Sequence, residues 1–276
     1  MVYYVCYLAD TKQLAHSTIK SYLAGIRNYC VVEGLDYPFV RHNGQAMLQL
    51  KLVLRGIKKS RVPKVLIRLP ITSAILIGFF EILNSNVLCQ YTKLLMKAAL
   101  SIAFFGFLRC GEFTTYSNEF DSDSNLCYGD VLLKPQEVYI NLKSSKTDPF
   151  RHGLKIPLFK NESPICPVTA MSNFMEERSR FAMDKTLPLF MFIDYTHLTR
   201  NKFICMLREL CVLSGIDSNE YSGHSFRIGA ATSCAKNGIA DHLIQSLGRW
   251  RSDCYKTYVR VSKSSTKEAQ SKMART

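Results

Sequence analysis

The N-terminal part of the chain has apolar residues at helical spacing, and this pattern predicts a small helical region. Residues 17–27 place four apolar side chains on one face of a helix, with Ser17 in position to cap its N-terminus. These side chains are Ile19, Tyr22, Leu23 and Ile26. A second helix is predicted from residue 44 or 45 to about residue 57, followed by a linker near residues 62–70.

From residue 71 the pattern predicts a larger region. Two apolar helical stretches come first, at about 72–84 and 91–108. Three short segments of alternating polarity then predict an antiparallel sheet, at 127–133, 137–142 and 153–158. Further helices are expected at 167–179, 199–213, 225–237, 240–247 and 252–260. The predicted fold class is mostly α with a small three-stranded antiparallel β-sheet, an α+β fold.

Composition adds an anionic partner to this picture. The chain has 276 residues, 47% of them hydrophobic, enough for one large domain or for a small domain followed by a larger one. The formal net charge is +14, and residues 1–70 hold 11 Lys and Arg against 3 Asp and Glu. This balance favours nucleic acid, although charge alone favours it only modestly. The ten cysteines form no CxxC pair and no zinc-binding spacing.

The clearest chemical signal is the string Gly223-His224-Ser225-Phe226-Arg227-Ile228-Gly229-Ala230-Ala231. It places His224 and Arg227 on one face near a predicted helix start, where main-chain N–H groups also favour anions. A lone histidine there is more often a capping or core residue. Trp250 and Tyr258 follow in a short basic segment, however, and the set suits attack by a tyrosine hydroxyl on a phosphodiester.

These residues resemble the C-terminal motif of the tyrosine recombinases, the family of the phage integrases and Cre recombinase. The family carries an Arg-x-x-Glu at the end of an apolar helix just before a small sheet, and Arg109 and Glu112 match it. Taken alone, this pair would be an ordinary helix-end ion pair. The catalytic lysine of the family lies in a β-hairpin, where Lys146 matches best and Lys143 is the alternative.

Trp250 matches the family position that is occupied by either His or Trp. Its indole N–H is a donor that stays neutral at every pH. The nucleophile of the family matches Tyr258, in Tyr258-Val259-Arg260, which lies eight residues after Trp250, a slightly shorter spacing than is usual. Tyr255 is expected to be a packing residue.

The resemblance implies a transesterification without a metal ion or another cofactor. Arg109 and Arg227 would neutralise the charge of the transition state, with Trp250 as a third donor. A phenol has a pKa of about 10, so the attacking hydroxyl needs this electrostatic help at neutral pH.

The proton transfers and the support of the site are implied in the same way. Tyr258 would attack phosphorus and form a 3′-phosphotyrosyl linkage, and His224 would accept its proton or hold the phosphate. Lys146 would protonate the departing 5′ oxygen. Glu112 would orient the site without touching the substrate.

The resemblance also implies two domains and a DNA partner. Residues 1–66 would form a helical core-binding domain with its linker, truncated or minimal for the family, and residues 67–276 the catalytic domain. The basic side chains expected to contact DNA are Lys20, Arg27, Lys51, Arg55, Lys58, Lys59 and Arg61. The expected partners are double-stranded DNA and further copies of the chain in a synaptic tetramer, with no membrane.

The implied function is that of a site-specific DNA recombinase or integrase, for integration or excision of a mobile element such as those of the Crypton or DIRS type. We expect an intracellular protein, nuclear if its source is eukaryotic. Three alternatives stay open at this point: a type IB topoisomerase, a domesticated DNA-binding protein that keeps an inactive fold, and a basic helical module whose motifs are coincidental.

Overall fold

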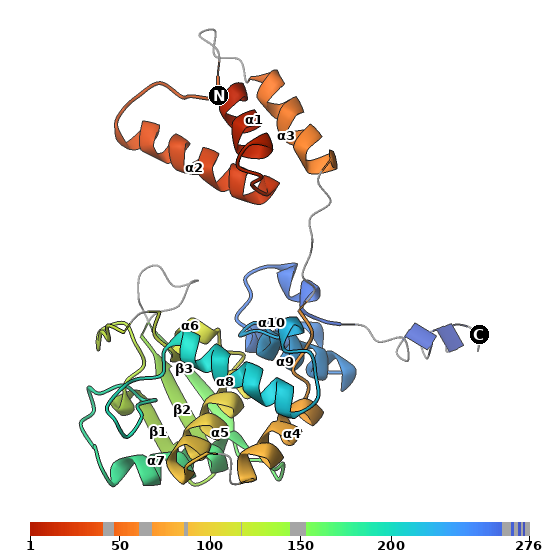
Figure 1. Cartoon of the computed structure of the whole chain (residues 1–276). Coiled ribbons are helices and arrows are strands. Elements are labelled where there is room, and N and C mark those ends of the chain that lie inside the picture. The colour runs from red at the N-terminus through yellow and green to blue at the C-terminus, as the bar shows by residue number, and fades with distance from the viewer. Residues whose placement is uncertain are drawn as a thin grey trace. The chain divides into compact units, whose positions relative to one another are not determined.

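The computed structural model describes residues 1–40, 47–60, 68–85, 88–116, 118–143, 153–260, 266–267, 270–271 and 273. The chain divides into two compact units, Met1–Leu66 and Ile67–Thr276, which we call unit 1 and unit 2 (Figure 1). Among the helices described, none is both long and apolar enough to cross a membrane.

Unit 1 contains the helices α1 (Val2–Asp10), α2 (His16–Val32) and α3 (Leu48–Ser60) (Figure 1). Their buried side chains form a small core of Val5, Leu8, Ala9, Ile19, Leu23 and Leu50. The capping prediction for Ser17 is wrong, because α2 begins at His16 and Ala15 is its N-cap residue. Tyr22 also lies outside the core, with 48% of its surface exposed.

Unit 2 is built around α5 (Gln90–Phe105), whose side chains are buried on most of its circumference. Helix α5 packs against α4 (Ser73–Asn84), α7 (Pro167–Ser179) and α9 (Ser225–Lys236). A helix surrounded by others must be apolar on nearly all sides, which explains the long hydrophobic run in the sequence. This central helix ends directly before the segment that carries Arg109.

The sheet of unit 2 consists of β1 (Val131–Lys134), β2 (Glu137–Leu142) and β3 (Leu154–Phe159), paired antiparallel in that order. The register pairs Val131 with Ile140, and Leu142 with Leu154. Alternate residues of β2 are buried and face the core. The predicted fold class, mostly helical with a three-stranded antiparallel sheet, is confirmed.

The remaining elements of unit 2 are α6 (Cys110–Phe113), α8 (Arg200–Leu213) and α10 (Asp241–Leu247), with 3₁₀ turns at Tyr128–Asp130, Ser218–Glu220 and Asp253–Thr257. The α-helix predicted at 252–260 is wrong. The Tyr258 N–H donates to the Tyr255 carbonyl at 2.8 Å, a bond across three residues that is typical of a 3₁₀ turn. The first strand also begins later than predicted, because residues 128–130 form such a turn.

Close packing of α9 requires glycine at one position. A Cβ atom added to Gly229 would lie 1.8 Å from the main-chain oxygen of Ile71. The Ile71 N–H donates to the Ser225 carbonyl at 3.0 Å, so the chain before α4 runs directly along the start of α9. The small residue at position 229 thus allows close packing behind the segment that carries His224 and Arg227.

Candidate active site

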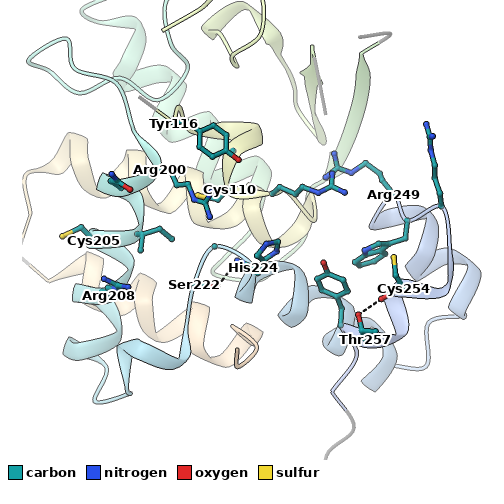
Figure 2. Close-up of a pocket in the computed structure, with 18 of the residues that line it drawn as sticks. Cys110, Tyr116, Arg200, Cys205, Arg208, Ser222, His224, Arg249, Cys254 and Thr257 are labelled. Atoms are coloured by element: carbon teal, nitrogen blue, oxygen red, sulfur yellow. Dashed lines mark hydrogen bonds between the residues drawn. The ribbon is translucent and has the colours of Figure 1, made fainter. Parts of the chain in front are cut away.

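An open cleft of about 1140 Å³ lies among α6, α8, the start of α9 and residues 249–258 (Figure 2). Its lining includes the arginines Arg109, Arg200, Arg208, Arg249 and Arg251, and among the described residues no Asp or Glu lines it. Within the same ranges, no three His, Cys, Asp or Glu side chains gather in a way that could hold a metal ion. The cleft is therefore suited to a polyanion.

Arg109 and Glu112 form a reciprocal cap at the start of α6. The Arg109 main-chain N–H donates to Glu112 Oε2 at 2.9 Å, and its guanidinium Nη1 donates to Oε1 at 2.8 Å. The Glu112 side chain is only 5% exposed, whereas that of Arg109 is 21% exposed and lines the cleft. A buried carboxylate thus fixes an arginine that opens toward solvent.

Arg227 is fully buried one turn into α9. Its guanidinium donates to the Phe107 carbonyl at 2.5 Å and to the Gly248 carbonyl at 2.6 Å, and lies 4.7 Å from the centre of the Trp250 ring. Burial, together with the positive charges of Arg109 and Arg249, lowers the pKa of Arg227 to about 10. Arg227 therefore supports the wall of the cleft from behind and adds positive potential to it.

His224 is the N-cap residue of α9 and lies exposed in the cleft. In Figure 2 it stands between Arg200 and Arg208 on one side and Arg249 on the other. Gly223 lets this turn approach α6 closely, because an added Cβ would lie 2.7 Å from Cβ of Cys110. The histidine is thereby held over the centre of the cleft.

Trp250 and Tyr258 are neighbours in space despite their shortened spacing. Their ring centres are 5.1 Å apart, and both residues line the cleft. Tyr255 is buried, with 4% exposure, and packs 6.3 Å from the Trp250 ring. Of the two tyrosines, Tyr258 is the one that opens into the cleft.

The main chain around Tyr258 is fixed by α9. The Thr232 hydroxyl donates to the Tyr258 carbonyl at 3.3 Å and accepts from the Arg260 N–H at 3.1 Å. The sequence motifs did not single out Thr232, because a threonine inside a helix gives no signal of such a long-range contact. It ties the tyrosine segment to the helix that carries Arg227.

The two candidate lysines of the hairpin differ in what the structure shows. Lys146 lies in residues 144–152, outside the described residues. Lys143 forms an ion pair with Asp130 at 2.7 Å and donates to Cys127 Sγ at 2.9 Å. Burial disfavours its charged form, but these hydrogen bonds outweigh burial and raise the pKa of Lys143. Lys143, directly after β2, is thus held by these contacts, and its ammonium group is a weaker acid than that of an ordinary lysine.

Arginines that sequence reasoning missed complete the cleft. Arg200 and Arg208 lie two turns apart on α8, a helical spacing that could have indicated a shared face. Arg249 donates to Glu112 Oε2 and to the Phe107 carbonyl, both at 2.9 Å. Its only sequence signal was its place beside Trp250.

The basic residues predicted for DNA contact lie on the helices of unit 1. Lys20 and Arg27 are exposed on α2. Helix α3 presents an exposed basic face and packs the opposite side on the core through Leu50, Val53, Leu54 and Ile57. The members of that basic face are Lys51, Arg55, Lys58 and Lys59. Arg61 lies outside the described residues.

Similarity in sequence extends to a known recombinase over part of the chain. No model of a known protein family matches the chain. The integrase/recombinase XerD homologue of Selenomonas ruminantium is 26% identical over 160 residues, which are 57% of this chain and 44% of that protein. The chain thus matches less than half the length of this curated relative.

Similarity in structure extends over nearly the whole chain. The XerH site-specific recombinase bound to its palindromic DNA substrate superposes with a TM-score of 0.67 at 17% identity, covering 98% of this chain and 71% of that one. The Tn1549 transposon integrase in complex with transposon-end DNA gives 0.59 at 16% identity, covering 99% and 84%. XerA recombinase gives 0.55 at 18% identity, covering 98% and 80%. The chain therefore has the fold of the tyrosine recombinases and is related in sequence to an integrase/recombinase, as its motifs indicate.

Proposed function

We propose that this protein is a site-specific DNA recombinase or integrase, which cleaves and rejoins DNA strands through a 3′-phosphotyrosyl intermediate. The observation that carries the proposal is the cleft itself. It combines an accessible tyrosine whose ring lies 5.1 Å from that of Trp250, a histidine at a helix start and a lining rich in arginine, with no carboxylate among the lining residues that the structure describes. A phosphodiester is the anion that this combination suits.

In the proposed reaction, the Tyr258 hydroxyl attacks the phosphorus and His224 takes up its proton. The bond from phosphorus to the 5′ oxygen breaks, and that oxygen leaves as a 5′-hydroxyl with a proton from Lys146. A 5′-hydroxyl of another strand then attacks the phosphotyrosine and releases the enzyme. Because one ester replaces another, no ATP is required.

The arginines stabilise the charge that develops in this step. Arg109, held by Glu112, faces the phosphate from the cleft wall, and Trp250 adds a neutral donor. Arg227 contributes through its buried charge. Burial, and after it the positive charges of Arg109 and Arg249, lower the pKa of Arg227, and a bound phosphate would offset the second of these causes. Glu112 acts on the arginines and not on the substrate.

Double-stranded DNA is the proposed partner of both units. The basic face of α3, with Lys20 and Arg27 on α2, would contact the phosphate backbone, so that unit 1 serves as the DNA-binding domain and unit 2 as the catalytic domain. Strand exchange joins more than one cleavage site, so we propose a homo-oligomer on DNA, a tetramer at synapsis. Integration or excision of a mobile element is the biological role that we propose. A nuclear location, if the source is eukaryotic, stays a prediction.

A nicked suicide substrate tests the proposal directly. The nick lets the cleaved strand fragment diffuse away, so a recombinase should remain covalently attached to its DNA and be retarded in a denaturing gel. Tight binding without any adduct would instead support the domesticated DNA-binding protein. Adduct formation with relaxation of supercoiled DNA, but without strand exchange between two sites, would support the topoisomerase.

A further inference from the structure

Arg249 adopts a backbone conformation that arginine does not favour. Its φ is 57°, in the left-handed region that glycine enters freely and other L residues enter at a cost. The preceding residue is a glycine, yet Gly248 has an ordinary φ of −81°. Gly248 is required for another reason, because an added Cβ would lie 1.7 Å from the Trp250 ring. An arginine at the strained position therefore points to a gain from its side chain.

That side chain connects the two halves of the candidate site. Arg249 Nη2 donates to Glu112 Oε2 and to the Phe107 carbonyl, which lie in the segment that carries Arg109. Its own main chain leads directly into Trp250, whose ring centre lies 5.1 Å from that of Tyr258. Arg249 thus connects the part of the cleft that contains Arg109 with the part that contains Tyr258.

The contact is buried and charged. The side chains of Arg249 and Glu112 are 13% and 5% exposed, so their ion pair is largely shielded from water. Glu112 Oε2 also accepts from the main-chain N–H of Arg109, and Glu112 Oε1 from the Arg109 guanidinium. Among the described residues, loss of Arg249 would leave the Glu112 carboxylate with Arg109 as its arginine partner, and we expect the orientation of Arg109 to change as a result.

We propose that Arg249 is a positioning residue, which holds Arg109 through Glu112 and fixes the positions of Trp250 and Tyr258 relative to Arg109. The expected effect on the rate of DNA cleavage rests on the proposed function. The expected effect on the position of Trp250 does not, since that position can be measured without DNA. Trp250 is the only tryptophan of the chain, so its fluorescence reports this one position.

The test compares Arg249→Gly, Arg249→Lys and the wild-type chain by two readouts. Glycine suits the left-handed backbone and removes the side chain, while lysine keeps the charge but not the planar fork. In the protein without DNA, we expect Arg249→Gly to shift the fluorescence emission of Trp250 to longer wavelength. We also expect it to slow covalent trapping at saturating DNA by about 10²-fold, the order associated with a misplaced catalytic group, with little change in DNA affinity. Arg249→Lys should lie between the two.

Two controls make the result specific. Arg180→Gly removes an exposed arginine paired with Glu176 and Glu177, and should change neither readout. Glu112→Gln combined with Arg249→Gly should be no worse than the more damaging single change, because both act through one ion pair. If Arg249→Gly folds poorly, Arg249→Lys can replace it in this double-mutant comparison with Glu112→Gln.

The proposal is overturned if Arg249→Gly leaves both emission and the trapping rate unchanged, or if the two changes are additive. It is also overturned if only DNA affinity falls, which would make Arg249 a simple DNA contact. Should the wild-type chain trap no DNA at all, the proposed function fails, and the emission of Trp250 still decides whether Arg249 positions it.

Discussion

At the scale of single residues, three arginines at different depths determine the charge at the cleft. Arg109 and Arg249 share the carboxylate of Glu112, while Arg227 donates to main-chain carbonyls beside Trp250. Burial, and after it the positive charges of Arg109 and Arg249, lower the pKa of Arg227 to about 10. These three arginines carry more positive charge than the single carboxylate of Glu112 neutralises. A bound phosphodiester would relieve that repulsion, which is the electrostatic argument for an anionic substrate.

The nucleophile can be assigned by a pair of matched substitutions. Tyr258→Phe removes one oxygen from a half-buried ring and should abolish covalent trapping, because the attacking atom is gone, while folding and DNA binding persist. Tyr255→Phe changes a buried packing residue and should retain trapping. Peptide mapping of the adduct identifies the tyrosine. DNA attached to Tyr255, or trapping by the Tyr258→Phe protein, would contradict the assignment.

The acid can be identified by the leaving group. Lys146→Ala should slow cleavage of a normal phosphodiester by about 10²-fold or more, since the departing 5′ oxygen needs a proton. A substrate with sulfur at the 5′-bridging position should be much less affected, because a thiolate leaves without one. Lys143→Ala, which breaks the ion pair with Asp130, should affect both substrates alike. Equal defects for Lys146→Ala would remove that lysine from the role.

The residues that could be predicted are those that belong to a local motif. His224 and Arg227 stand in one string, and Arg109 and Glu112 three residues apart, so the sequence alone places each pair on one turn. Arg249 could not be predicted in the same way. Its role depends on a left-handed backbone and on an ion pair with a residue 137 positions away, and neither feature produces a periodic pattern in the sequence.

At the scale of elements, periodicity predicted what is long and regular. The helix at 167–179 and the strand at 137–142 have the predicted bounds, because each buries one repeating face. The segment 252–260 also has apolar residues at helical spacing, yet it forms a short 3₁₀ turn that presents Tyr258 at its end. Its shape is set by contacts with Thr232 and Trp250, which lie outside the segment.

Packing of α9 against the chain before α4 should be sensitive to a single methyl group. Gly229→Ala would place Cβ 1.8 Å from the Ile71 main-chain oxygen, which cannot rotate away, and should lower the free energy of unfolding by about 1–3 kcal/mol. Gly78→Ala is the matched control in α4 of the same unit. Apart from its chain neighbours and the backbone of its own helix, no described atom lies within 4 Å of its added Cβ, so the change should stabilise the fold by about 0.5–1 kcal/mol. Urea unfolding followed by Trp250 fluorescence measures both, and equal midpoints would contradict this account of α9.

At the scale of the whole molecule, basic residues are concentrated in both units, to which the proposed function assigns different tasks. In unit 1, the small core leaves most of α3 exposed, and its outer face is basic. In unit 2, the cleft gathers arginines around Tyr258. In the proposed function, the first arrangement would contact any DNA backbone, and the second would act on one phosphate. Affinity and cleavage should therefore be separable by mutation.

Neutralising two lysines of unit 1 tests this separation. Lys58 and Lys59 are exposed in the last turn of α3, and each phosphate that they contact should add about −0.9 to the slope of log affinity against log salt. The Lys58→Ala/Lys59→Ala protein should show a shallower slope and weaker binding to all DNA sequences alike. Its trapping rate at saturating DNA should stay near that of the wild type, because no atom of the cleft has changed. The Lys58→Arg/Lys59→Arg protein keeps both charges and should keep the slope. An unchanged slope in the alanine variant would show that α3 does not contact DNA, and a slower trapping rate would show that unit 1 takes part in cleavage itself.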